Sequence, residues 1–165
     1  MSVAADASPA AAPLAFGETL DEVRWARLDE AGYAAASFLD ERLLEDPRVE
    51  RWVTPWRDAE LAAEGLGDEA DFIFHLGHVG STLLSRILGR SPAVFSLREP
   101  EALRRLAVGE AASLARLGPL LRLYARTWRP EQRALVKATS FVAEIGGAIL
   151  ERMASARSIM LVTAS

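Results

Sequence analysis

The chain of 165 residues contains no cysteine, so disulfide bonds, thiolate metal sites and cysteine nucleophiles are excluded. It contains two histidines, His75 and His78, and no HExxH spacing, so we expect no metal cofactor. Lysine is almost absent as well. Lys137 is the single lysine, while every other basic side chain is an arginine, and its position in the fold therefore matters.

A basic field and long apolar runs are also absent. The formal net charge of −4 provides no overall attraction for nucleic acid, so we expect no nucleic-acid partner. No window reaches the roughly 18 apolar residues that span a bilayer, which excludes an ordinary membrane helix. The N-terminus lacks the basic leader and apolar block of a signal peptide, so the sequence predicts a cytoplasmic protein.

The composition changes twice along the chain. Residues 1–17 are rich in alanine and proline, which predicts a disordered tail. Residues 18–66 favour a helical extension, in which Thr19 and Glu22 match a capping box. A turn-rich boundary follows, and residues 67–165 form a third segment with a different pattern of apolar residues.

In this third segment short apolar runs alternate with helical patterns. The runs at 72–76, 93–97, 134–138 and 158–163 predict strands, and the segments between them predict helices. This alternation indicates an α/β domain with a P-loop-type parallel sheet flanked by helices. The chain ends directly after the fourth run, where such a strand would lead into its functional loop. The sequence therefore predicts an incomplete sheet, truncated at its C-terminal side.

The loop after the first predicted strand, "LGHVGST" (76–82), suits an anion. Gly77 and Gly80 let the backbone bend, and the amides of the next helix lack helical partners. Ser81 and Thr82 add hydroxyl donors, and His78 adds a ring donor. A tight structural turn with Ser81 as N-cap is the alternative. The helix that follows should present an apolar face to the sheet, formed by Leu83, Leu84, Ile87 and Leu88.

Two known nucleotide loops do not match this segment. The Walker A pattern requires a longer loop and a lysine before the serine, and the dinucleotide pattern G-x-G-x-x-G is absent. The sequence itself therefore leaves the anion undefined.

The segment "FIFHLGHVGSTLLSRIL" resembles the 5′-phosphosulfate-binding loop of the sulfotransferase family. Gly80, Ser81 and Thr82 match the family's Gly-[Ser/Thr]-Thr core, and His78 falls at its basic position. The resemblance implies that this loop, from Gly77 through His78 and Val79 to Thr82, binds the co-substrate 3′-phosphoadenylyl sulfate.

Two further fragments are similar to the family. "FSLREP" (95–100) ends the second strand in a Glu-Pro turn, and "LVKATS" (135–140) ends the third strand in Lys137. The resemblance implies that His78 and Lys137 stabilise the leaving group. Sulfuryl transfer also needs a base for the acceptor, and the carboxylate of Glu99 at the strand end is our candidate. Lys137 as a surface lysine remains an alternative, as does Glu99 in a pair with Arg98 or Arg104 or as a helix cap. We expect His75 to be packed beneath the loop.

The resemblance covers residues 70–165 and implies transfer of a sulfuryl group to a hydroxyl or amine of a small-molecule, carbohydrate or peptide acceptor. The family's 3′-phosphate element, which follows the fourth strand, has no assignable counterpart here. Two alternatives stay open. One is a P-loop nucleotide kinase or NTPase, against which stand the missing loop lysine and the lack of an aspartate after the fourth strand. The other is a non-catalytic remnant that acts as a binding module.

Overall fold

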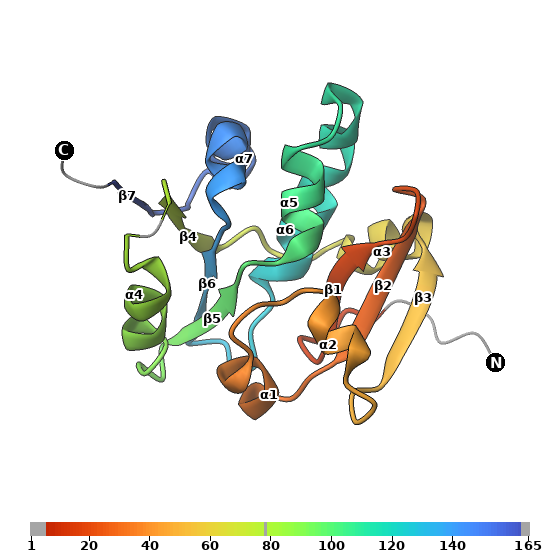
Figure 1. Ribbon diagram of the computed structural model, residues 1–165, viewed down its shortest axis with the longest axis horizontal. Coiled ribbons are helices and arrows are strands. Elements are labelled where there is room, and N and C mark those ends of the chain that lie inside the picture. Colours follow the sequence, from red (N-terminus) through yellow and green to blue (C-terminus); the bar gives the residue numbers. More distant parts are fainter. Residues whose placement is uncertain (1–5, 78, 163–165) are drawn as a thin grey trace.

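The computed structural model describes residues 6–77 and 79–162, which form two β-sheets surrounded by helices (Figure 1). The larger sheet has four parallel strands in the order β5-β6-β4-β7. These strands are β4 (Ala70–His75), β5 (Val94–Arg98), β6 (Arg133–Lys137) and β7 (Ser158–Leu161). They coincide with the four predicted apolar runs, so the α/β class with a parallel sheet is confirmed.

Helices cover the parallel sheet on both sides. In Figure 1, α4 (Ser81–Leu88) lies on one side, while α6 (Leu117–Ala125) and α7 (Gly146–Arg152) lie on the other. The connections add α5 (Glu101–Ala107) and the 3-10 helices η1 (Ala111–Arg116) and η2 (Ser140–Ile145). A Cβ atom on Gly146 would lie 3.7 Å from the Phe74 ring, so α7 packs closely on β4. None of the described helices is long and apolar enough to cross a membrane.

From residue 6 onward, the N-terminal part of the chain contradicts the predicted tail and helical extension, while residues 1–5 of the predicted tail lie outside the described residues. It forms a three-stranded antiparallel sheet of β1 (Ala11–Phe16), β2 (Glu22–Arg27) and β3 (Arg51–Pro55). Three short helices accompany it: α1 (Glu30–Ala35), α2 (Glu41–Glu45) and α3 (Trp56–Ala63). Every residue of β1 is buried, because the strand pairs with β2 and packs against α5 and α6.

Tertiary packing explains why the helical prediction for residues 19–27 was wrong. Val23 and Trp25 lie two residues apart on one face of the strand and are both buried, while Glu22 and Arg24, on the other face, are exposed and half-buried. The indole of Trp25 also donates a hydrogen bond of 2.9 Å to Thr54 Oγ1 on the neighbouring strand β3. Burial of this face outweighs the helix propensity of the alanines, arginines and glutamates around it.

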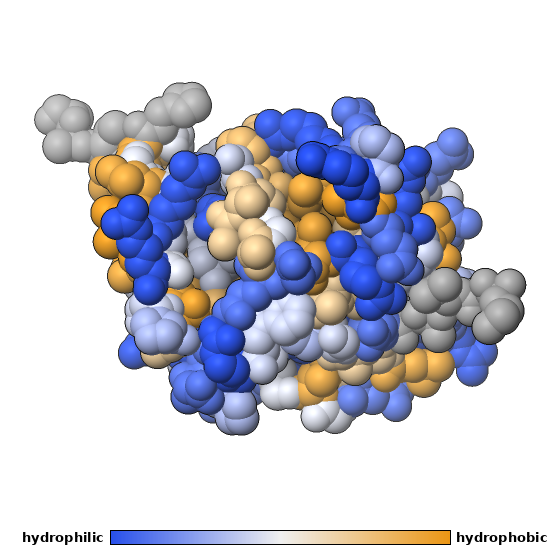
Figure 2. All heavy atoms as spheres, turned by 90° about the horizontal axis from the view of Figure 1, so that it is seen from below, coloured by the Kyte–Doolittle hydropathy of each residue, from blue (hydrophilic) through white to orange (hydrophobic). Residues whose placement is uncertain are grey.

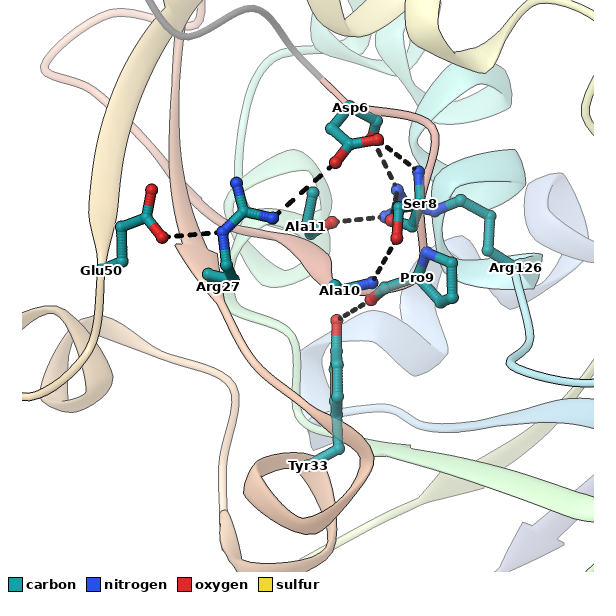
Figure 3. A network of polar contacts seen from close by, with 9 residues as sticks. All are labelled: Asp6, Ser8, Pro9, Ala10, Ala11, Arg27, Tyr33, Glu50 and Arg126. Carbon is teal, nitrogen blue, oxygen red and sulfur yellow. Dashed lines mark hydrogen bonds and ion pairs between the residues drawn. The ribbon is translucent and has the colours of Figure 1, made fainter.

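Arg126 fastens the N-terminal segment to the α/β domain, as Figure 3 shows. Its side chain is buried, and burial lowers the pKa of the guanidinium from its ordinary value. No carboxylate pairs closely with it among the described residues. Instead it donates to backbone carbonyl oxygens, at 2.9 Å to Asp6, 2.5 Å to Ser8, 2.6 Å to Ala11 and 2.5 Å to Leu123. Residues 6–11 are therefore held in place from within the domain.

The face that α4 turns to the sheet is also different from the one predicted. Ser81 and Ser85 are buried, and the Ser85 hydroxyl lies 2.8 Å from that of Ser96 on β5. Leu83 and Ile87 remain 64% and 54% exposed. The small serines let α4 approach the strands closely, which leaves Leu83 and Ile87 on the outer side of the helix, while Leu84 and Leu88 are half-buried. Figure 2 shows hydrophobic surface on the left of the molecule, the side on which α4 and β7 lie in Figure 1.

Candidate functional site

The order of the strands defines where the parallel sheet opens. The chain runs from β4 to β5 and back to β6 on one side, then crosses to β7 on the other side of β4. Ligands of open α/β sheets bind beyond the carboxyl ends of the strands where the direction of winding reverses. That point is the carboxyl end of β4, from which the loop 76–80 leads directly into α4.

The loop is bent by two glycines that adopt left-handed backbone conformations. Gly77 has a φ of 72° and Gly80 a φ of 79°, and a Cβ atom on either would meet no neighbour within 4 Å. Glycine is therefore required by the backbone conformation and not by a lack of space. Gly80 is the N-cap of α4 and no side chain caps the helix, so the alternative of a Ser81 N-cap is wrong. The first amides of α4 stay available to a ligand.

An open cleft of about 510 Å³ lies over this loop. It brings together every predicted site residue that the structure describes, from three different strand ends. His78 lies outside the described residues. The predicted residues in its lining are Gly77, Val79, Gly80, Ser81, Thr82, Glu99 and Lys137.

Lys137 is not a surface residue. It is 2% exposed at the end of β6, and its ammonium donates a hydrogen bond to Glu99 Oε1 at the end of the neighbouring strand β5. The two residues are also joined through the backbone, because the Glu99 amide donates to the Lys137 carbonyl oxygen at 2.7 Å. A buried ammonium needs such a counter-charge, since an unpaired charge inside a protein is costly.

Glu99 is held in an unusual backbone conformation. Its φ of 48° lies in the left-handed region, and it is the one non-glycine residue in the described ranges with a positive φ. It neither pairs with Arg98 nor caps α5, whose N-terminus has no side-chain cap. The Arg98 guanidinium points the other way and donates to the carbonyl oxygens of Tyr33 and Ala36 at 2.7 and 2.9 Å. The strained turn thus aims the Glu99 carboxylate at Lys137 and the cleft.

Two polar groups in the lining of the cleft were not among the predicted site residues. His75 is buried, and its Nδ1 donates to the Gly77 carbonyl oxygen at 2.8 Å, so it supports the loop as expected. Its buried Nε2 has no hydrogen-bond partner among the described residues. Thr139 Oγ1 is likewise buried without a partner there. In the sequence, His75 lies two residues before Gly77 and Thr139 two residues after Lys137. This nearness to predicted site residues was the signal that could have identified them.

A second hollow of about 290 Å³ adjoins the cleft and has an acidic lining. Glu99, Arg104 and Thr139 line both spaces. The remaining lining residues of the second hollow come from α2 with its N-cap and from the start of α5, and they are Asp40, Glu41, Arg42, Glu45 and Glu101. At the mouth of the first cleft, the Arg104 guanidinium lies 5.4 Å from the centre of the Phe141 ring. The described residues include no group of three or more side chains arranged to hold a metal ion.

No family model matches the chain, and neither a curated protein nor a solved structure matches it. The functional interpretation therefore depends on the residues and geometry of the cleft.

Proposed function

We propose that the cleft binds 3′-phosphoadenylyl sulfate and transfers its sulfuryl group to a hydroxyl or amine acceptor. The observation that carries the proposal is the meeting of Gly77, residues 79–82, Glu99 and Lys137 at one edge of the sheet. These segments are the ones whose sequences resemble the sulfotransferase family. Their convergence supports the proposal because the three segments lie far apart along the chain.

The donor's 5′-phosphosulfate fits the loop chemically. The first amides of α4, together with the Ser81 and Thr82 hydroxyls, supply hydrogen-bond donors, and the helix dipole adds positive potential. In this proposal Lys137 and His78 stabilise charge on the oxygen that bridges phosphorus and sulfur. Catalysis then comes from positioning and from electrostatic stabilisation of the leaving group.

The transfer step uses Glu99 as the base. The acceptor oxygen or nitrogen attacks sulfur and forms a new bond, while the bond between sulfur and the bridging oxygen breaks. The electron pair of that bond stays on the departing 3′-phosphoadenosine 5′-phosphate. The proton of the acceptor passes to the Glu99 carboxylate, which lies at the border between the loop cleft and the adjoining hollow.

Titration calorimetry with 3′-phosphoadenosine 5′-phosphate and with ATP-Mg tests the donor class. We expect the first to bind more tightly, and Ser81→Ala and Thr82→Ala to weaken it about tenfold, the scale of one lost hydrogen bond to a charged group. Ser91→Ala is the matched control, because Ser91 is exposed just beyond the far end of α4. A preference for ATP-Mg would instead support the kinase or NTPase alternative. Radiolabelled sulfuryl transfer to a panel of hydroxyl and amine acceptors then tests the reaction.

A further inference from the structure

We infer that the Lys137–Glu99 pair is a ligand-operated switch, in which an anion in the loop takes over the ammonium of Lys137 and releases the Glu99 carboxylate. This inference deepens the proposed function and, for the role of Glu99 as base, rests on it. It starts from a conflict within the site: the cation expected to hold the donor and the carboxylate expected to accept a proton neutralise one another.

The two partners of the pair are held to different degrees. Lys137 is 2% exposed within the sheet, and the described residues give its Nζ one hydrogen-bond partner, Glu99. The side chain of Glu99 is 22% exposed and lies in a turn beyond the end of its strand. Because the ammonium is fixed and the carboxylate is at the border of solvent, the carboxylate is the group that moves.

Another carboxylate in the same sheet shows what a permanently paired group looks like. Asp71 accepts hydrogen bonds from the Arg133 side chain at 2.8 Å, from the Arg157 amide at 2.9 Å and from the Arg157 guanidinium at 2.6 Å. Glu99 has the Lys137 ammonium alone as a side-chain partner among the described residues. The Glu99 carboxylate can therefore leave without breaking a network.

The structure also provides a second position for the released carboxylate. Glu99 and Thr139 both line the loop cleft and the adjoining hollow. The buried Thr139 Oγ1 has no hydrogen-bond partner among the described residues, so its hydroxyl proton is available to a carboxylate that turns from Lys137. After the carboxylate has moved, the first turn of α4 and the Lys137 ammonium would together surround the anion.

The exchange has a consequence for the order of binding. While the Lys137 ammonium donates to Glu99, the carboxylate is turned toward the lysine and away from an incoming hydroxyl or amine. Once the donor's phosphate binds the Lys137 ammonium, the Glu99 carboxylate becomes free at the border between the loop cleft and the adjoining hollow. The donor must therefore bind before Glu99 can act as base.

Inorganic pyrophosphate is a suitable probe of the exchange, because it carries neither an adenosine nor a sulfuryl group. We expect Glu99→Gln to bind pyrophosphate about fivefold or more tightly than the unmodified chain, since the anion no longer competes with a carboxylate. Glu101→Gln is the matched control: it removes one nearby charge from the adjoining hollow but leaves Lys137 paired, and we expect a change within about twofold. In a Lys137→Met background, Glu99→Gln should bring no gain.

A direct readout uses the fact that Lys137 is the single lysine of the chain. Labelling with ¹⁵N-lysine gives one side-chain ammonium signal, which should shift on addition of pyrophosphate and should already be displaced in Glu99→Gln. The inference is overturned if Glu99→Gln binds pyrophosphate no better than Glu101→Gln, if neither it nor the unmodified chain binds, or if the signal stays unmoved at saturation. Failure of the sulfotransferase proposal looks different, because ATP-Mg would then bind better than 3′-phosphoadenosine 5′-phosphate while the pyrophosphate results stay as predicted.

Discussion

The side chains of Glu99 and Lys137 form an ion pair across neighbouring strand ends, and a backbone hydrogen bond of 2.7 Å joins the same two residues. The double link holds Glu99 at a φ of 48°, a conformation that L-residues rarely adopt. One residue thus carries both the counter-charge of a buried lysine and a strained turn at the edge of the cleft.

The strain at Glu99 can be separated from its charge by two substitutions. Glu99→Gly and Glu99→Ala both remove the carboxylate, but glycine adopts a positive φ without penalty. We expect Glu99→Gly to be more stable than Glu99→Ala by about 1 kcal/mol. Urea denaturation of both variants measures the difference, and equal stabilities would mean that residue 99 is not held in the left-handed conformation in solution.

A side chain at position 80 should destabilise the fold for the same conformational reason. At a φ of 79°, Gly80→Ala should destabilise the fold by about 1 kcal/mol and weaken anion binding, because the first amides of α4 would shift. Gly147→Ala is the control. Gly147 lies in α7 without a positive φ, and an added Cβ atom would meet no neighbour within 4 Å, so alanine should be neutral or stabilise by about 0.5 kcal/mol. Thermal unfolding and pyrophosphate titration of both variants provide the comparison, and equal behaviour of the two would contradict it.

Asp71 should make stability depend on acid pH. Burial by itself would raise the pKa of this carboxyl group, but hydrogen bonds from Arg157 and Arg133 outweigh it and hold the pKa below its ordinary value. A lowered pKa stabilises the fold above the unfolded value of about 4, and this contribution is lost as the pH falls through the folded value. Asp71→Asn should therefore cost about 1–3 kcal/mol at pH 7 and progressively less below about pH 4.

Denaturant unfolding between pH 3 and pH 7 checks this expectation for Asp71. The control is Asp68→Asn, an exposed position just before β4, which should change stability by no more than about 0.5 kcal/mol. If the difference in unfolding free energy between Asp71→Asn and the unmodified chain stays constant down to pH 3, the Asp71 carboxylate does not stabilise the fold.

Arg126 should contribute more to stability than an exposed arginine that forms an ion pair. Arg126→Met leaves the carbonyl oxygens of Asp6, Ser8 and Ala11 without their donor, and we expect a loss of about 2–4 kcal/mol. Arg129→Met removes a surface pair with Glu30 and should change stability much less. Hydrogen exchange should also show β1 losing protection in Arg126→Met alone. Equal destabilisation by the two substitutions would disprove the anchoring role.

The parallel sheet and the loop could be predicted from the sequence because their signals are local. An apolar run such as "FIFHL" forms a buried strand wherever helices cover it, and the glycines at 77 and 80 mark the turn that follows. Parallel strands also place their carboxyl ends at one edge, so the sequence alone predicts Glu99 and Lys137 near the loop. These features follow from backbone sterics and hydrophobic periodicity.

The N-terminal sheet depended on partners that the local sequence does not reveal. The alanine-rich β1 has little intrinsic preference for a strand, and it is ordered because β2, α5 and α6 bury it and Arg126 holds the residues before it. Likewise, Ser85 of α4 is buried against β5 while Leu83 and Ile87 stay exposed, because close approach to the strand requires a small side chain.

By itself the sequence determined the alternation of strands and helices and the bend of the loop at Gly77 and Gly80, since both follow from neighbours along the chain. It also placed the polar strand ends at one sheet edge, because parallel strands share that edge. Tertiary structure alone decided that Lys137 is buried and that Glu99 is its partner, although 38 positions separate the two residues. A charge enters a protein interior only where a counter-charge from elsewhere meets it, and the fold brings those two strand ends together.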